Sequence, residues 1–229
     1  MAERDKILGR IREALTVPAP YPTDSHSSLP PLSTGSPSTE TIRRCLPPVG
    51  QSLAERLELF TKSTAALRAD FQLLANRDEL LRHLCALRDA EGWRKVGTHS
   101  GVLTDDVAAR LGLPFCRTDQ PYEVGELESC SVGLTQCDAL VAQTGSVLVT
   151  SRSAGGRALS VLPPHHVVLA RREQLLADLP AAFELLKQTY APNYPSFISF
   201  ITGPSRTGDI ERILVLGAHG PKKLTILCI

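Results

Sequence analysis

Apolar residues recur along the chain at two different spacings. An apolar residue at every third or fourth position, with charged residues between, is typical of amphipathic helices. This spacing predicts helices over residues 3–15, 53–67, 78–87 and 173–190, the last of them kinked at Pro180. A shorter helix is predicted with Thr104 as its N-cap and with its end at Gly112.

Short apolar runs lie between the predicted helices. Several of them are apolar at every position, which is typical of strands in a parallel sheet that is covered on both sides. The alternation of strands and helices therefore predicts an α/β fold with a mostly parallel sheet and helices on both faces. The predicted strands are residues 71–74, 94–97, 114–116, 130–134, 139–142, 147–150, 167–170, 197–201, 213–216 and 224–228.

The N-terminal region differs in composition from the rest of the chain. Residues 18–50 are dense in Pro, Ser and Thr and have almost no periodic apolar pattern, which is typical of an extended linker. We therefore predict an N-terminal helical arm over 1–17, a linker over 18–50 and one α/β domain over 51–229.

Charge and cysteine spacing exclude several classes of function. The net charge of +1 gives no bias toward nucleic acid, no apolar run approaches the about 20 residues that span a bilayer, and the charged start does not resemble a secretory signal. Six scattered cysteines without a C-x-x-C motif do not match iron–sulfur or zinc spacings and are typical of reduced cytosolic thiols. The sequence predicts a cytoplasmic protein with no metal or cofactor of its own.

The segment Gly203–Asp209 has the residues of an anion-binding loop. Its glycines let backbone N–H groups converge, and a short helix predicted to follow adds partial positive charge. Its arginine can grip a carboxylate or phosphate with two hydrogen bonds. In the alternative interpretation, a loop hydroxyl only caps the helix, and the acids Asp209 and Glu211 favour its dipole. The candidate anion contacts are Gly203, Ser205, Arg206 and Thr207.

A second loop, His219-Gly220-Pro221-Lys222, also follows an apolar run, and adjacent strands are predicted to bring it beside the first loop. His219 is a candidate acid–base catalyst because histidine titrates near neutral pH, and Asp209 is the other candidate. Gly220 is a further candidate ligand contact. The alternative for His219 is a turn residue hydrogen-bonded to the backbone.

Three more polar positions are candidate ligand contacts. Thr144 and Gly145 lie in a predicted hairpin turn, and Arg157 follows two glycines; the alternative is turn chemistry and a solvated charge. The adjacent residues His165 and His166 are not predicted to bind one metal, because consecutive strand residues face opposite ways. Ligands of parallel sheets bind beyond the carboxyl ends of the strands, where we expect the candidate loops.

Four blocks of residues together resemble the lactate utilization (LUD) domain. They are CDALVAQTGS at 137–146, LPPHHV at 162–167, TGPSRTGDIE at 202–211 and VLGAHGPK at 215–222. Their order is more specific than any single block. The short length and the missing cysteine motifs resemble the lactate utilization protein C family within this group. The positions that match the family motif are Thr144, Gly145, Gly203, Pro204, Ser205, Arg206, Thr207, Asp209, His219, Gly220 and Pro221.

The resemblance implies a fold and a role. The fold is the sandwich shared by sugar-phosphate isomerases and CoA-transferases (NagB/RpiA/CoA-transferase-like). The role is that of a non-redox subunit of a bacterial system that oxidises L-lactate to pyruvate, with the iron–sulfur clusters on two partner proteins. Gly208 stands where the family usually has alanine, and Gln143 where it often has glutamate, which argues against a CoA-transferase-like glutamate nucleophile.

Two other functions are consistent with the residues. One is a stand-alone enzyme or binding protein for a phosphorylated or carboxylate-bearing small molecule, like CoA-transferases or the cyclo-ligases of related fold. The other is a scaffold whose N-terminal arm wraps a partner.

Overall fold

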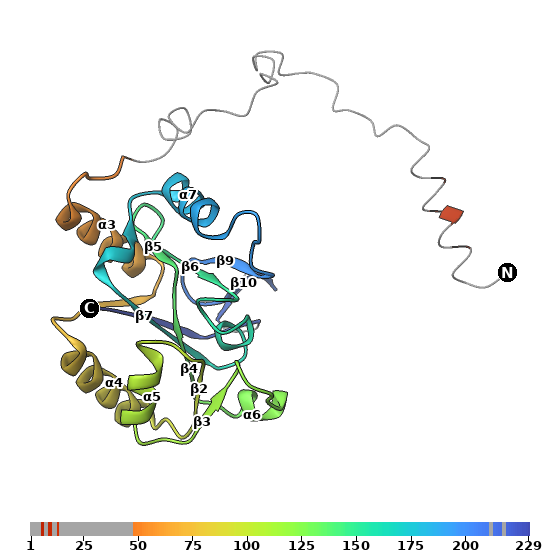
Figure 1. Cartoon of the computed structure of the whole chain (residues 1–229). Coiled ribbons are helices and arrows are strands. Elements are labelled where there is room, and N and C mark those ends of the chain that lie inside the picture. Colours follow the sequence, from red (N-terminus) through yellow and green to blue (C-terminus); the bar gives the residue numbers. More distant parts are fainter. Residues whose placement is uncertain (1–5, 7–8, 11–12, 14–47, 211–212, 217–218) are drawn as a thin grey trace, which may run out of the picture. The chain divides into compact units, whose positions relative to one another are not determined.

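The computed structural model describes Lys6, Gly9, Arg10, Glu13 and residues 48–210, 213–216 and 219–229 (Figure 1). The four separate N-terminal residues are helical. The remainder of the predicted arm and nearly all of the predicted linker lie outside the described residues, so this division of the chain stays a prediction.

Within the described residues, six strands form a central sheet in which every neighbouring pair is parallel. Strand β7 lies inside the sheet and all its residues are buried, as expected for a strand covered on both faces. In spatial order the strands are β1 (Asp70–Leu73), β12 (Lys223–Cys228), β7 (His165–Ala170), β4 (Val132–Gln136), β2 (Val96–Thr98) and β3 (Phe115–Arg117).

A second sheet packs against one face of the central sheet. Its strands β5 and β6 form the predicted hairpin, whose turn contains Gly145 at a φ of 64°, a left-handed conformation that favours glycine. A separate two-stranded hairpin follows it in the chain. Over the described residues, the second sheet contains, in spatial order, β8 (Leu175–Leu176), β5 (Ala139–Val141), β6 (Ser146–Thr150) and β9 (Ile198–Ile201), and the hairpin contains β10 (Arg206–Ile210) and β11 (Ile213–Leu216).

Helices lie on both sides of this pair of sheets (Figure 1). One helical pair packs on the free face of the central sheet, and another helix packs on the far face of the second sheet. Further helices fill the space beside the second sheet. The predicted α/β class and mostly parallel sheet are therefore confirmed. These helices are α4 (Arg77–Glu91) and α5 (Thr104–Arg110) on the first face, α7 (Leu179–Tyr190) on the far face, and α3 (Leu53–Ala66), α6 (Val124–Glu128) and the 3₁₀ helices η1 (Ala158–Ser160) and η2 (Arg172–Gln174) elsewhere.

Local sequence signals define the ends of the two longest helices. The Ser52 hydroxyl accepts a hydrogen bond from the N–H of Glu55, whose carboxylate bonds back to Ser52, so α3 begins with a capping box. The Asn76 side chain accepts a hydrogen bond from the N–H of Glu79 at the start of α4, and Gly92 ends that helix at a φ of 65°.

Three sequence predictions about helix ends are wrong. The helix predicted from residue 173 begins at Leu179, because Asp178 caps it and Pro180 lies in its first turn, where the missing N–H costs nothing. Thr104 is the first residue of α5 and not its N-cap. The short helix predicted after the Gly203 loop is strand β10, because this segment pairs with β11 through long-range backbone contacts.

Buried histidines are a further feature of the central sheet. His99 follows β2, and His165 and His166 begin β7. Burial lowers the pKa of all three, and that of His166 falls to about 3. Burial acts to raise the pKa of Glu91, but the hydrogen bonds that it accepts from Trp93, Lys223 and His165 lower that pKa to about 2.

Replacing Phe60 by alanine tests the packing of α3. The ring is fully buried and contacts Phe71 edge to face, with ring centroids 4.9 Å apart. Phe60→Ala should lower the free energy of unfolding by about 3–5 kcal/mol, as measured by urea denaturation. Leu53→Ala, at a residue of the same helix that is 48% exposed, should change it by only about 0.5 kcal/mol. Equal losses would contradict the assignment of Phe60 to the core.

The buried histidines predict a pH dependence of stability. The pKa of His166 is lower in the folded chain than its usual 6.5, so the unfolded chain binds the additional proton. This contribution to stability is complete above about pH 6.5 and is lost as the pH falls toward 3. His166→Gln should therefore reduce the slope of unfolding free energy against pH by about 1 kcal/mol per pH unit between pH 6 and 5. Phe60→Ala removes no titrating group and should leave the slope unchanged.

Candidate functional site

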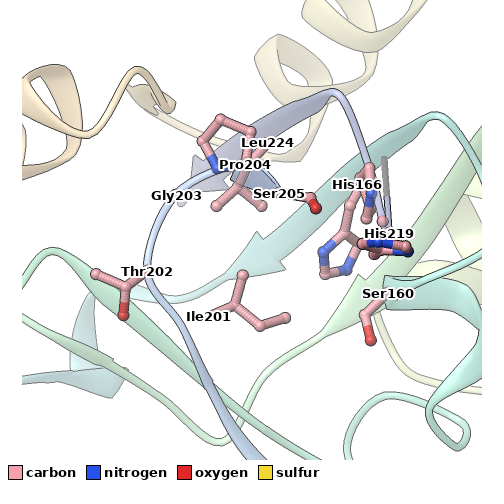
Figure 2. A pocket seen from close by; sticks show the side chains of 11 residues that line it. Ser160, His166, Ile201, Thr202, Gly203, Pro204, Ser205, His219 and Leu224 are labelled. Carbon is pink, nitrogen blue, oxygen red and sulfur yellow. The ribbon is translucent and has the colours of Figure 1, made fainter. Parts of the chain in front are cut away.

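The two glycine loops predicted as neighbours do lie side by side. The N–H of Ser205 donates a hydrogen bond to the carbonyl of Pro221 over 2.9 Å, which joins the Gly203 loop to the His219 loop. Together they form one wall of a cavity of about 230 Å³ (Figure 2). The cavity is lined by Ser160, His166, Ile201, Thr202, Gly203, Pro204, Ser205, His219, Gly220, Pro221 and Leu224.

Contacts with α3 hold the Gly203 loop in place. Gly203 has a φ of 86°, and a Cβ atom there would lie 2.9 Å from the carbonyl oxygen of Leu67 and 2.8 Å from the guanidinium of Arg206. That guanidinium donates to the same carbonyl over 2.5 Å, at the C-terminal end of α3. A cationic side chain is favourable there, because the last carbonyls of a helix carry partial negative charge.

The cavity lies at the edge of the central sheet opposite to the one predicted from the sequence. His166 and Leu224 are the second residues of β7 and β12, so the cavity is at the amino ends of these parallel strands. Ile201, from the second sheet, lines it from the other side. The expectation of a site beyond the carboxyl ends is therefore wrong for this cavity. The His219 loop leads into β12 instead of leaving a parallel strand, and the Gly203 loop leaves the second sheet.

His166 is the most deeply buried polar residue of the cavity wall. Its side chain is 1% exposed, and its Nε2 lies 2.8 Å from the Oγ1 of Thr135 on β4. Its Nδ1 is buried and has no hydrogen-bond partner among the described residues. With a pKa of about 3, owing to burial, the imidazole is neutral at pH 7. In Figure 2 the side chains of His166, His219, Ser160 and Ser205 gather toward one end of the cavity.

His165 faces the opposite side of the sheet, as the alternation of strand residues predicts. Its Nδ1 lies 2.9 Å from Oε2 of Glu91, and its Nε2 lies 2.9 Å from Oγ1 of Thr225. Its ring also contacts Trp93 edge to face. Both nitrogens of His165 thus have partners, whereas His166 has one nitrogen without a partner in the described chain. In the sequence this pair suggests only a question of metal binding, so His166 was not predicted as a cavity residue.

Hydroxyl groups extend from the cavity toward the hairpin turn. The Ser160 Oγ donates to the carbonyl of Arg157 over 2.9 Å. The Thr202 Oγ1 lies 2.8 Å from the Oγ of Ser146, which donates to the Oγ1 of Thr144 over 2.8 Å. Thr144 is therefore linked to the cavity through two hydrogen bonds and does not line it.

The structure brings some of the predicted ligand contacts together and separates others. Gly203, Ser205, His219 and Gly220 line the cavity. Gly145 packs on α3, where a Cβ atom would lie 2.9 Å from the Cβ of Ser63.

The two predicted basic residues, Arg157 and Arg206, are not among the described lining residues. Arg157 is exposed, and its guanidinium lies 5.8 Å from the ring centroid of Phe197. Thr207 and Asp209 belong to β10, and their side chains, like Glu211, lie outside the described part of the structure. The ligand and catalytic roles of all these residues stay predictions.

The described cysteines are buried or partly buried, and Cys45 lies outside the described residues. Burial raises the pKa of Cys130 and Cys228 to about 11 and also raises that of Cys137. Among the described residues, no group of three or more His, Cys, Asp or Glu side chains is placed to hold a metal ion. In the same part of the chain, no helix has the length and apolar character to cross a bilayer.

Known protein families and relatives are similar to the region of the chain that contains the cavity. The LUD domain family matches residues 125–229, which include every lining residue of the cavity. A lactate utilization protein C from Anoxybacillus flavithermus is 35% identical over 148 residues, covering 58% of this chain and 66% of that protein. The corresponding protein of Bacillus subtilis is 32% identical over 108 residues, covering 46% of this chain and 45% of its own length. The matches thus span about half to two thirds of these relatives.

A solved structure shares the fold. A DUF162 family protein from Deinococcus radiodurans superposes with a TM-score of 0.60 at 21% identity, covering 78% of this chain and 99% of that one. The family match, the repeated similarity to lactate utilization protein C from several bacteria and the shared fold agree with one another. This chain belongs to the lactate utilization protein C family, and the LUD domain family matches its residues 125–229.

Proposed function

We propose that this chain works in bacterial lactate utilization, as a non-redox subunit of a system that oxidises L-lactate to pyruvate. The observation that carries the proposal is the similarity to lactate utilization protein C across the segment that builds the cavity. In this proposal the chain acts in the cytoplasm with two iron–sulfur partner proteins, which hold the redox centres.

The state of the cysteines supports placing the redox centres on other chains. Thiolates, and not thiols, ligate iron–sulfur clusters. Burial raises the pKa of Cys130 and Cys228 to about 11, and among the described residues no three His, Cys, Asp or Glu side chains converge on one centre. Cys137 is 4% exposed and its pKa is also raised by burial. These side chains stabilise the core as small apolar groups.

A second candidate function is that of an enzyme or binding protein for a small carboxylate. The observation in its favour is a cavity whose described lining residues offer hydroxyl and imidazole groups and include no Lys, Arg, Asp or Glu. A phosphate with two negative charges is usually bound by Arg or Lys. The neutral lining therefore favours a singly charged carboxylate over a phosphorylated ligand.

Deleting the gene in the organism that encodes it should abolish growth on L-lactate as sole carbon source. Growth on pyruvate should be normal, because the proposed step precedes pyruvate. Growth rates on the two carbon sources, with and without the gene supplied on a plasmid, measure the effect. Unimpaired growth of the deletion strain on L-lactate would contradict the proposal.

Replacing Gly203 by alanine tests whether the cavity serves this function. A Cβ atom at Gly203 would collide with the Leu67 carbonyl and the Arg206 guanidinium, so the loop must shift. Gly92→Ala is a matched control, because Gly92 also has positive φ but has open space around it. Both variants should lose about 1 kcal/mol of stability from the left-handed backbone conformation, and Gly203→Ala should lose more because of the collision. In the deletion strain, only Gly203→Ala should fail to restore growth on L-lactate. Equal growth with Gly203→Ala and Gly92→Ala would show that the shape of this loop is not needed for growth on L-lactate.

A further inference from the structure

The hydrogen bond between Thr135 and His166 determines which nitrogen of His166 carries the proton. Thr135 is fully buried, and its Oγ1 has no partner among the described residues except the Nε2 of His166, 2.8 Å away. If Nε2–H donated this bond, the threonine hydroxyl would be a buried donor without an acceptor, which is unfavourable. The Thr135 hydroxyl therefore donates to Nε2. A neutral imidazole then carries its proton on Nδ1.

The Nδ1–H of His166 is consequently a buried donor with no acceptor in the described part of the chain. His166 is 1% exposed and belongs to the cavity wall. Buried polar groups in folded proteins nearly always have a hydrogen-bond partner. A ligand oxygen in the cavity would supply that partner. The neutral state of the ring follows from its burial, so the donor is present throughout the physiological pH range.

Two serine hydroxyls of the cavity complement this donor. The Ser205 Oγ has no hydrogen-bond partner among the described residues, so its hydroxyl is available to donate. Ser160 is 8% exposed, and its hydroxyl already donates a hydrogen bond to the carbonyl of Arg157. Its Oγ can therefore accept a hydrogen bond from a ligand hydroxyl. Ile201, Pro204 and Leu224 provide apolar contacts beside them. These described groups supply two donors, one acceptor and an apolar wall, and His219 lies beside them in the lining.

We propose that this cavity binds a small organic acid, whose carboxylate accepts hydrogen bonds from the Nδ1–H of His166 and the hydroxyl of Ser205. The Ser160 Oγ accepts a hydrogen bond from a hydroxyl of the acid. Thr135 does not touch the ligand; it is a positioning residue that fixes the proton of His166 on Nδ1. The choice of an organic acid rests on the proposed function in lactate utilization, but the assignment of these residues rests on the geometry.

The binding experiment uses the purified full-length chain and isothermal titration calorimetry. L-Lactate and pyruvate should bind, whereas L-lactamide, which lacks the carboxylate, should bind at least about 10-fold more weakly. His166→Gln keeps a partner for Thr135 but removes the Nδ1–H, and should weaken L-lactate binding by about 10- to 100-fold. Circular dichroism verifies that each variant is folded.

Variants of Thr135 distinguish a positioning role from a structural one. Thr135→Val removes the hydroxyl and should weaken binding by about 3- to 10-fold, while Thr135→Ser keeps the hydroxyl and should restore the affinity. Thr225→Val is the matched control, because Thr225 makes the equivalent hydrogen bond to His165 on the opposite face of the sheet. Thr225→Val should leave the affinity for L-lactate unchanged.

Nuclear magnetic resonance of the wild-type chain provides a test that needs no variant. Two-bond proton–nitrogen correlations should show His166 protonated on Nδ1 without ligand, and the Nδ1–H signal should shift when L-lactate is added. Protonation on Nε2 would overturn the proposal, as would unchanged affinity in His166→Gln or no binding of either acid to the wild-type chain. The proposed role in lactate utilization would survive these outcomes if the deletion strain still failed to grow on L-lactate.

Discussion

The pairing of β7 with β4 on one side and with β12 on the other fixes the geometry of the site. Because side chains alternate along a strand, this pairing sends His165 and His166 to opposite faces of a buried sheet. His165 meets Glu91 and Thr225, so its two ring nitrogens both have partners. His166 contacts Thr135 with one nitrogen, and its other nitrogen is buried without a partner among the described residues in a side chain that lines the cavity. The same residue type is thus structural on one face and available for a ligand on the other.

The cavity depends on parts of the chain that lie outside the LUD match. Residues 125–229 supply its lining, but α3, over Leu53–Ala66, holds the Gly203 loop through the Leu67 carbonyl. This contact explains why Gly203 tolerates no Cβ atom and why Arg206 points to a helix end. A fragment restricted to the matched residues would lack that support. The N-terminal half of the domain is therefore part of the site's architecture, although it carries none of its lining residues.

Local patterns in the sequence were sufficient to predict elements whose determinants are local. The helices near residues 53–67 and 78–87 follow from apolar spacing, and the β5–β6 turn follows from Gly145. Long-range pairing was not predictable in this way. The segment from Arg206 to Ile210 carries signals for a helix start, yet its pairing with β11 makes it a strand.

The site was predicted only in part, because only some of its residues have local signals in the sequence. Conspicuous turn residues such as Gly203 and His219 identified the loops, and both line the cavity. His166 lies in an otherwise apolar strand, and only its tertiary contact with Thr135, 31 positions away in the sequence, distinguishes it from a core histidine. The loops were also placed at the wrong edge of the sheet, because apolar spacing does not show that the Gly203 loop leaves a second sheet.

The two arginines predicted to grip an anion have protein partners in this structure, which changes how recognition must work. Arg206 bonds the end of α3, and Arg157 lies over the ring of Phe197. In the proposed binding mode the donors to the carboxylate are the Nδ1–H of His166 and the hydroxyl of Ser205, which are neutral. Neutral donors bind a carboxylate through directed hydrogen bonds and leave part of its charge to solvent, so the affinity is moderate and exchange is fast. Such a cavity suits a metabolite that enters and leaves at every turnover better than a permanently bound anionic cofactor.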